Sequence, residues 1–243
     1  MGKVFAILSG KGGTGKSTVS VGLGLSYAAK GQKVLLIDLD EGLRCLDLMT
    51  GVTEELVFDL ADLLEGRPLA DGIYSTALSE NLFLIPAPAA ENRLKIPLFQ
   101  TLISVLSAEY DVIILDFAAG INRDLLSALP PDTRCLAVCN PDPVSIRGAA
   151  TLSDCLVGFH REPLLILNQF IAWNFCDSGF QTIDDVVDAG GMRLIGIVSH
   201  DAALTQLSVC HTLPAKGNAA RAFARIVRRL DGENVKLPRP KKI

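Results

Sequence analysis

The chain has 243 residues, of which 49% are hydrophobic and 21% are charged, and its formal net charge at pH 7 is −4. This length fits one large α/β domain or two small ones, and the apolar fraction is ample for a packed core. The negative charge argues against a protein whose whole surface binds nucleic acid, and it leaves room only for a local basic patch.

Apolar runs that suit buried strands alternate with helical patterns along the chain, which predicts one doubly wound, mostly parallel sheet flanked by helices. Because helices cover both faces of such a sheet, its strands form continuous apolar runs. The predicted strands are 4–8, 34–37, 82–85, 112–115, 136–139, 164–167 and 194–198. The predicted helices are 17–30, 58–64, 97–108, 145–159, 182–189 and 218–230, with Ser145 and Thr182 as expected N-terminal caps. No linker or repeat divides the chain, so we expect one domain over residues 1–231 and a short tail with proline and lysine over 232–243.

The first predicted strand leads into the segment Gly10-Lys11-Gly12-Gly13-Thr14-Gly15-Lys16-Ser17-Thr18, and a predicted helix follows it. Two glycines that flank four residues before Lys-Ser are the pattern of a phosphate-binding P-loop, and the strand–loop–helix context agrees with it. The glycines let backbone N–H groups point inward at an anion, and the helix adds the positive end of its dipole. Lys16 can then reach the terminal phosphates of a nucleotide, and the Ser17 hydroxyl can bind Mg²⁺.

Lys11 is a second lysine in this loop, at a place where an ordinary P-loop requires none. A lysine there points away from the adjoining helix end, from where it can reach a nucleotide held by a facing copy of the same chain. A solvated loop lysine is the other interpretation, and the spacing alone leaves both open.

Acidic side chains follow two further predicted strands. Asp38 closes the second strand and Asp40 lies two residues on, so both can face one side if the extended backbone continues. Asp116 ends the apolar run 112–115, which is a Walker B pattern. Ligands of open α/β sheets lie beyond the carboxyl ends of the strands, where a magnesium nucleotide needs nearby carboxylates and the attacking water needs an acceptor. The alternative for each residue is a polar strand end without a chemical role.

Asn168 ends the strand predicted over 164–167, and its amide offers the donor and the acceptor that an adenine edge needs. A turn residue at a strand end is the alternative. The segment Asn168-Gln169-Phe170 lacks the lysine and the aspartate of the Asn-Lys-x-Asp motif that GTP-binding P-loop proteins usually carry, which favours ATP.

From Lys3 to about Leu230 the chain resembles the MinD/ParA family of P-loop ATPases. Residues 11–18 resemble its deviant Walker A motif, and residues 38–48 resemble its first switch region in the form typical of the MinD branch. The resemblance implies a switch that dimerises when it binds ATP and Mg²⁺, hydrolyses ATP to ADP and phosphate, and determines septum placement in cell division. The resemblance implies that Lys11 acts on the nucleotide of the partner subunit and that Lys16 stabilises the phosphates of its own nucleotide. It implies that Asp40 orients the attacking water and that Asn168 contacts the base. The magnesium site would be formed by Ser17, Asp38 and Asp116.

Three positions in these motifs depart from the family pattern. Glu41 stands where the family usually has an apolar residue, Cys45 where it has asparagine, and Ala118 where it has proline. None of the three carries the expected chemistry, but Glu41 and Cys45 lie on a surface that the family uses for its dimer and its activator.

The resemblance also implies partners: a second copy of the chain, an activator of MinE type or an equivalent, and an anionic membrane surface. In the family a C-terminal amphipathic helix binds this membrane, but Pro238 and Pro240 forbid a regular helix in the tail. We expect a last helix packed on the core with a solvated arginine face, and binding of anionic lipid or an acidic partner by those arginines is the alternative.

Two other functions suit the same fold. A ParA-like ATPase would position cargo, chromosomes or organelles by binding nucleic acid or a protein scaffold instead of membrane. An amide-forming or metal-inserting enzyme would need an added substrate domain or metal-binding cysteines, and the sequence indicates neither.

Cysteines and apolar stretches indicate the compartment. Cys135 and Cys139 fall on one face of a predicted strand, but no Cys-x-x-Cys pair occurs, so we interpret them as small buried residues. No secretory signal peptide and no membrane-spanning stretch is visible. We therefore expect a cytoplasmic protein with reduced thiols, peripheral at the inner face of the cell membrane when it binds there.

Overall fold

One eight-stranded sheet forms the centre of the computed structural model, which describes residues 2–172, 179–213 and 217–237. The strand order is β3-β4-β2-β5-β1-β6-β7-β8, and each pair of neighbours is parallel except β3 and β4. The strands are β1 (Lys3–Leu8), β2 (Val34–Leu39), β3 (Tyr74–Thr76), β4 (Ser79–Ile85), β5 (Val112–Phe117), β6 (Arg134–Cys139), β7 (Pro163–Phe170) and β8 (Arg193–Ser199).

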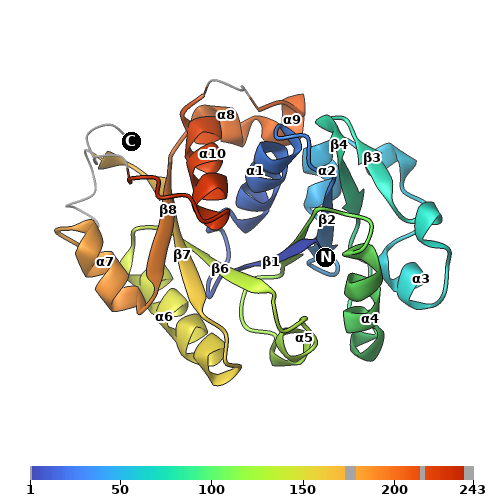
Figure 1. Cartoon of the computed structure of the whole chain (residues 1–243), viewed down its shortest axis with the longest axis horizontal. Helices are drawn as coiled ribbons and strands as arrows, with labels where there is room; N and C mark the ends of the chain where they lie inside the picture. The colour runs from blue at the N-terminus through green and yellow to red at the C-terminus, as the bar shows by residue number, and fades with distance from the viewer. Residues whose placement is uncertain (1, 173–178, 214–216, 238–243) are drawn as a thin grey trace.

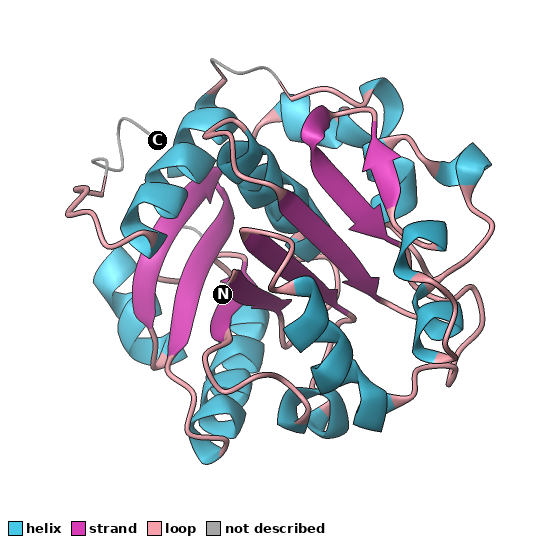
Figure 2. Cartoon of the chain, turned by 45° about the vertical axis from the view of Figure 1, so that its right-hand side comes forward, coloured by secondary structure: helices cyan, strands magenta, loops and turns pink. Residues whose placement is uncertain are grey.

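Helices cover both faces of this sheet (Figures 1 and 2). They are α1 (Lys16–Ala28), α2 (Leu46–Thr50), α3 (Leu60–Leu64), α4 (Ile96–Leu106), α5 (Arg123–Ser127), α6 (Pro143–Gly158), α7 (Ile183–Gly190), α8 (Ala202–Thr205), α9 (Leu207–Cys210) and α10 (Asn218–Leu230), with short 3-10 turns η1 (Thr53–Glu55) and η2 (Leu69–Asp71). One core lies between the sheet and α1, α2, α9 and α10, and the other lies between the sheet and α3 to α7. In β1, for example, Phe5 and Ile7 point into the first core, whereas Ala6 and Leu8 point into the second.

The predicted doubly wound sheet is confirmed, and each predicted strand is present with ends within three residues of the expectation. The antiparallel edge strand β3 was not predicted, because three residues are too few to show a pattern. Both thiols predicted as core residues are buried, and burial raises the pKa of Cys135 to about 11 and that of Cys139 to about 12. Within the described ranges, the longest helices are too short or too polar to cross a bilayer.

The prediction for the start of α6 was wrong. Ser145 is not its cap, because α6 begins at Pro143 and the Asp142 carboxylate accepts from the backbone N–H groups of Val144 and Ser145. Proline suits the first turn of a helix, since its missing N–H has no partner there in any case. The Ser145 hydroxyl instead accepts from the backbone N–H of Asn140. The predicted cap of α7, Thr182, is confirmed, and it forms a capping box with Asp185.

The last helix packs as expected, with one correction to its arginine face. Phe223 and Ile226 on its apolar side are fully buried. Arg229 is not simply solvated, because its guanidinium donates to the carbonyl oxygens of Ile195 (2.8 Å) and Leu194 (3.4 Å) on the edge strand β8. The predicted tail beyond Leu237 lies outside the described residues.

Asp231 fastens the end of α10 to the opposite end of the chain. Its carboxylate accepts from the Lys3 ammonium at 2.6 Å, from the Lys30 ammonium, and from the buried Tyr27 hydroxyl at 3.4 Å. Burial raises the pKa of Asp231, but the hydrogen bonds from Lys3 and Lys30 outweigh it, so the pKa lies below its ordinary value.

Asp231→Ala is expected to lower the free energy of unfolding at pH 7 by about 1–3 kcal/mol, because it leaves a buried hydroxyl and two ammonium groups without their acceptor. A carboxyl with a depressed pKa stabilises the fold above its unfolded pKa, so the difference from the unmodified protein shrinks as the pH falls below about 4. Urea unfolding at several pH values measures this. Glu233→Ala, which breaks an exposed pair with Arg228, is the control and should cost less than about 1 kcal/mol. Equal losses from both substitutions would contradict the expectation.

Candidate nucleotide site

The P-loop leaves the sheet at its topological centre. β1 lies between β5 and β6 in the sheet, and the strand order reverses direction at β1. The loop after β1 therefore faces the crevice in which open α/β sheets bind their ligands. Gly13 and Gly15 have φ of 76° and 85°, and Gly15 is the N-terminal cap of α1. A Cβ at Gly15 would lie 2.3 Å from the Asn168 side-chain nitrogen, so both the backbone and the space require glycine here. Loop amides and the α1 N-terminus therefore meet at one place, which suits an anion.

Two acidic side chains lie beside this loop at the ends of neighbouring strands. Asp38 on β2 and Asp116 on β5 are partners in the strand register, and each side chain is buried. Two serine hydroxyls of α1 donate hydrogen bonds to the Asp116 carboxylate. They belong to Ser17 and to Ser20, and the Ser20 bond is 2.9 Å long. Ser20 was not among the residues predicted for this site, although it lies three residues after Ser17 and therefore on the same side of the helix.

The pKa values of both carboxyl groups are raised. Burial raises the pKa of Asp116 to about 7, the nearby Asp38 carboxylate adds to the rise, and hydrogen bonds from Ser17 and Ser20 oppose it. Burial raises the pKa of Asp38 to about 6, and backbone N–H groups oppose that rise. Two buried carboxylates beside a hydroxyl form an oxygen-rich, negatively charged place that a divalent cation would neutralise. These residues therefore fit Mg²⁺.

Asp38 also shapes the loop that carries the other predicted carboxylate. Its oxygens accept from the backbone N–H groups of Asp40 (2.9 Å), Cys45 (3.1 Å) and Leu46 (3.1 Å). Asp40 itself is half-buried, and burial raises its pKa while the nearby Lys16 ammonium lowers it. The two acids thus have different surroundings: Asp38 is bound to backbone, whereas Asp40 lies by the lysine of the phosphate site.

Lys11 lies on the outer side of the P-loop. Its ammonium is 3.4 Å from the Asp142 carboxylate that caps α6, and both side chains are substantially exposed. Lys16, in contrast, is buried as the first residue of α1. The two lysines of the loop therefore point to different places, and in a single chain Lys11 pairs with the cap of α6.

The predicted base contact, Asn168, is buried under the P-loop. Its side-chain nitrogen donates to the Thr14 carbonyl oxygen at 2.7 Å, and that of Gln169 donates to the Gly13 carbonyl oxygen at 3.4 Å. A cavity of about 140 Å³ opens beside them, between the P-loop and the ends of β7 and β8. Its lining is Gly15, Thr18, Asn168, Gln169, Ser199, His200, Asp201, Leu204 and Thr205. The position of this cavity beside the phosphate loop suits a nucleotide base.

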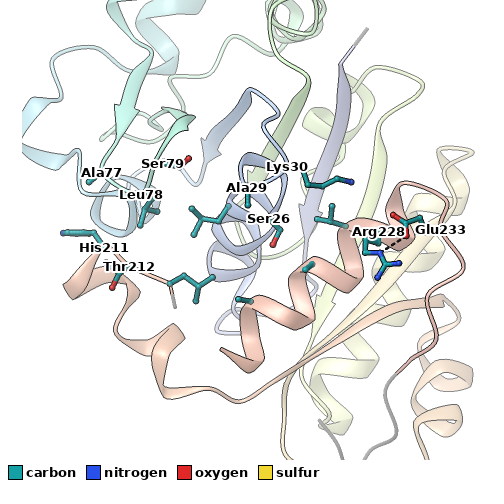
Figure 3. A pocket seen from close by; sticks show the side chains of 15 residues that line it. Ser26, Ala29, Lys30, Ala77, Leu78, Ser79, His211, Thr212, Arg228 and Glu233 are labelled. Atoms are coloured by element: carbon teal, nitrogen blue, oxygen red, sulfur yellow. Dashed lines mark hydrogen bonds and ion pairs between the residues drawn. The ribbon is translucent and has the colours of Figure 1, made fainter. Parts of the chain in front are cut away.

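A larger cavity, of about 650 Å³, lies away from this site (Figure 3). It runs between α1, α10 and the turn from β3 to β4, and the Arg228–Glu233 pair lies at one end with His211 and Thr212 at the other. Because its lining includes no P-loop residue, this cavity is not the nucleotide site.

The fold and the site together define a P-loop nucleotide hydrolase. A family model described as an AAA domain matches residues 2–169. The septum site-determining protein MinD of Bacillus subtilis is 30% identical over 98% of this chain and 92% of its own length, and that of Thermotoga maritima is 30% identical over 98% and 91%. The structure of the MinC:MinD cell division protein complex of Aquifex aeolicus superposes with a TM-score of 0.87 at 31% identity, covering 98% of this chain and 99% of that one. The chain belongs to the MinD family of P-loop ATPases.

Proposed function

We propose that this chain is an ATP-dependent dimerising switch that hydrolyses ATP to ADP and phosphate and helps to determine septum placement in cell division. The main support for the proposal is the different placement of two lysines of the P-loop. Lys16 is buried in the phosphate site, whereas Lys11 lies outside it and is exposed. The relatives from Bacillus subtilis and Thermotoga maritima are septum site-determining proteins, which supports the cellular role.

Within one chain, Lys16 and the loop amides bind the phosphates and stabilise the charge that develops on them. Ser17 would hold Mg²⁺, and Asp38 and Asp116 would lie around it. When bound, this ion would neutralise negative charge on the nucleotide phosphates. Asp40 accepts a hydrogen bond from the attacking water and so orients it toward the terminal phosphate.

Base choice follows from the orientation of Asn168. Its side-chain nitrogen is committed to the Thr14 carbonyl, so its oxygen is the atom left for the base. Adenine can donate its exocyclic amino group to that oxygen, whereas guanine would present a carbonyl oxygen there. This arrangement supports ATP as the nucleotide.

Lys11 acts across the dimer. Its pair with Asp142 is exposed, and such pairs contribute about 1 kcal/mol or less, so the lysine can leave it at little cost. In the dimer it would contact the phosphates of the partner's nucleotide, which makes association depend on ATP.

The relatives also suggest a protein partner and a membrane partner for this chain. The Aquifex relative is found in a complex with MinC, which supports a protein partner here as well. We propose an activator of MinE type or an equivalent, and peripheral binding to an anionic membrane on the cytoplasmic side. Arg221 and Arg225 on α10 and the basic tail would supply the positive charge for that surface.

Lys11→Ala is expected to abolish ATP-dependent dimerisation and to lower hydrolysis about tenfold or more, while ATP affinity of the monomer stays within about threefold, because the lysine serves the other subunit. Analytical ultracentrifugation with Mg²⁺ and a non-hydrolysable ATP analogue measures the dimer, and phosphate release measures turnover. Lys33→Ala, at the opposite end of the sheet, is the control. A Lys11→Ala variant that dimerises and turns over like the unmodified chain would refute the trans role.

Co-sedimentation with anionic vesicles, compared with binding to duplex DNA, separates the cellular roles. Pelleting with vesicles in ATP but not in ADP, and its loss in Lys11→Ala, supports the membrane-bound switch. Salt-sensitive DNA binding in ATP without vesicle binding supports the ParA-like positioning role instead.

A further inference from the structure

The loop that carries Asp40 is fastened to a second loop, which follows β4. One oxygen of the Glu41 carboxylate accepts from the backbone N–H groups of Arg93 (2.7 Å) and Leu94 (3.1 Å). Beside it, the Gly42 N–H donates to the Pro88 carbonyl oxygen at 3.0 Å. We refer to these three hydrogen bonds as the Glu41 clasp. It joins residues 52 positions apart in the chain.

The receiving side of the clasp is a small anion-binding turn. Asn92 has φ of 61°, a left-handed conformation that lets the amides of Arg93 and Leu94 point to the same side. Successive N–H groups arranged in this way bind anionic oxygen, and hydrogen bonds to a carboxylate are shorter and stronger than those to a neutral acceptor. An apolar side chain at position 41 could not accept these two hydrogen bonds.

The receiving loop is itself braced against α3. The Arg93 guanidinium lies 3.7 Å from carboxylate oxygens of both Asp62 and Glu65, and the Lys95 ammonium lies 3.6 Å from Glu65. The Pro86 carbonyl oxygen accepts from the first backbone N–H of α3, that of Leu60. The clasp therefore ties the Asp40 loop to a part of the fold that has its own supports, rather than to a free loop.

On its other side the clasp adjoins Asp40. The Asp40 N–H is held by Asp38 at 2.9 Å, and the next residue, Glu41, is held by the clasp. The Asp40 side chain lies near Lys16, while the Glu41 side chain reaches the loop after β4. Anchors on both flanks thus hold the stretch of backbone from which the Asp40 side chain projects.

We propose that Glu41 is a positioning residue for ATP hydrolysis: it fixes the Asp40 carboxylate at the phosphate site by anchoring the Asp40 loop to the amides of Arg93 and Leu94. This inference rests on the proposed function, because it assumes that Asp40 orients the attacking water. Among the described residues, the hydrogen bonds of the Glu41 side chain go to Arg93 and Leu94, and Glu41 is not in the lining of the base cavity. Its contribution therefore falls on the chemical step rather than on nucleotide binding.

Steady-state hydrolysis by purified full-length chains tests the inference. For Glu41→Ala we expect kcat to fall about 3- to 10-fold with KM for ATP within twofold, because a looser Asp40 reduces the fraction of productive orientations. Glu41→Gln, which keeps an acceptor oxygen, should recover at least half of the lost rate. Glu109→Ala, which removes an exposed carboxylate in the turn after α4, should leave kcat and KM unchanged. An unchanged kcat in Glu41→Ala, or a raised KM with unchanged kcat, would overturn the positioning role.

Hydrogen exchange of the nucleotide-free protein tests the clasp independently of any activity. The amides of Arg93 and Leu94 should exchange at least about tenfold faster in Glu41→Ala than in the unmodified chain, and Glu109→Ala should not change them. Equal exchange in the two proteins would overturn the clasp itself. If the clasp is present but the unmodified chain hydrolyses no ATP under any condition, the proposed function fails and the positioning role fails with it, while the contact stands.

Discussion

Asp116→Asn is expected to make the nucleotide-free protein more stable at pH 8 by about 2–4 kcal/mol and to lower ATP hydrolysis by about 10- to 100-fold. The two effects have one cause. Asp116 is buried beside Asp38 at the ends of neighbouring strands, and burial raises its pKa to about 7. Ionisation of the Asp116 carboxyl therefore lowers the stability of the folded, nucleotide-free protein. A magnesium nucleotide nevertheless needs this ionised form.

The sign of the pH dependence follows from proton linkage. Between the unfolded pKa, about 4, and the folded pKa, about 7, the folded chain binds more protons at Asp116 than the unfolded chain does. Stability of the unmodified protein therefore falls as the pH rises through this window, and the full penalty is present above pH 7. Asparagine carries no charge, so the variant should lose the part of this decline that Asp116 causes and keep the part that Asp38 causes. It should match the unmodified protein below about pH 4.

Thermal unfolding from pH 4 to pH 8, without nucleotide, measures the effect. Asp132→Asn, which neutralises an exposed carboxylate, is the control and should shift stability by less than about 0.5 kcal/mol. Adding Mg²⁺ and ATP should stabilise the unmodified chain more than Asp116→Asn, since the ion offsets the paired carboxylates. A variant that is less stable than the unmodified chain at pH 8 would show that the ionised Asp116 is not costly.

The sequence predicted the parts of the site that lie within short segments. The P-loop, Lys16 and Ser17 fall in one continuous pattern, and Asp38 and Asp116 follow apolar runs, so parallel strands had to bring them to one edge. The short helices α2, α5, α8 and α9 were not predicted, because four or five residues show no clear helical period. The equally short α3 was predicted because Gly66 marks its end. The cap of α6 was predicted wrongly because Asp142 and Ser145, three residues apart, are both good cap residues. Pro143 distinguishes them, because proline favours the first turn of a helix and so points to Asp142 as the cap.

Contacts between distant segments could not be predicted. Asn168 was expected at the base, but its burial under Thr14 depends on a hydrogen bond across 154 positions. The Glu41 clasp spans 52 positions, and its amides at Arg93 and Leu94 have no sequence signature, because any residue except proline supplies a backbone N–H. Such contacts decide how the motif residues are held, whereas the motifs decide only which residues are present.

The second large effect is expected where the P-loop rests on α6. The backbones of Gly10 and Gly148 touch, and a Cβ built on Gly10 would lie 2.1 Å from the Gly148 carbonyl oxygen. One built on Gly148 would lie 3.2 Å from the Gly10 backbone, which is tight enough to displace the loop by tenths of an ångström. Several N–H groups of the loop must meet one phosphate chain together, so a small displacement weakens all of them.

Gly148→Ala is therefore expected to weaken ATP binding about tenfold, and Gly10→Ala about 100-fold or more. Gly158→Ala is the matched control, because Gly158 lies in the same helix with open space around its Cα. Alanine favours helix more than glycine does at both positions, although less at Gly158, which is the last residue of α6. Weaker ATP binding in Gly148→Ala but not in Gly158→Ala therefore reports the contact with the P-loop. Isothermal titration with ATP and Mg²⁺ measures affinity, and circular dichroism confirms folding. If Gly148→Ala binds ATP as tightly as Gly158→Ala, then α6 does not set the position of the phosphate loop.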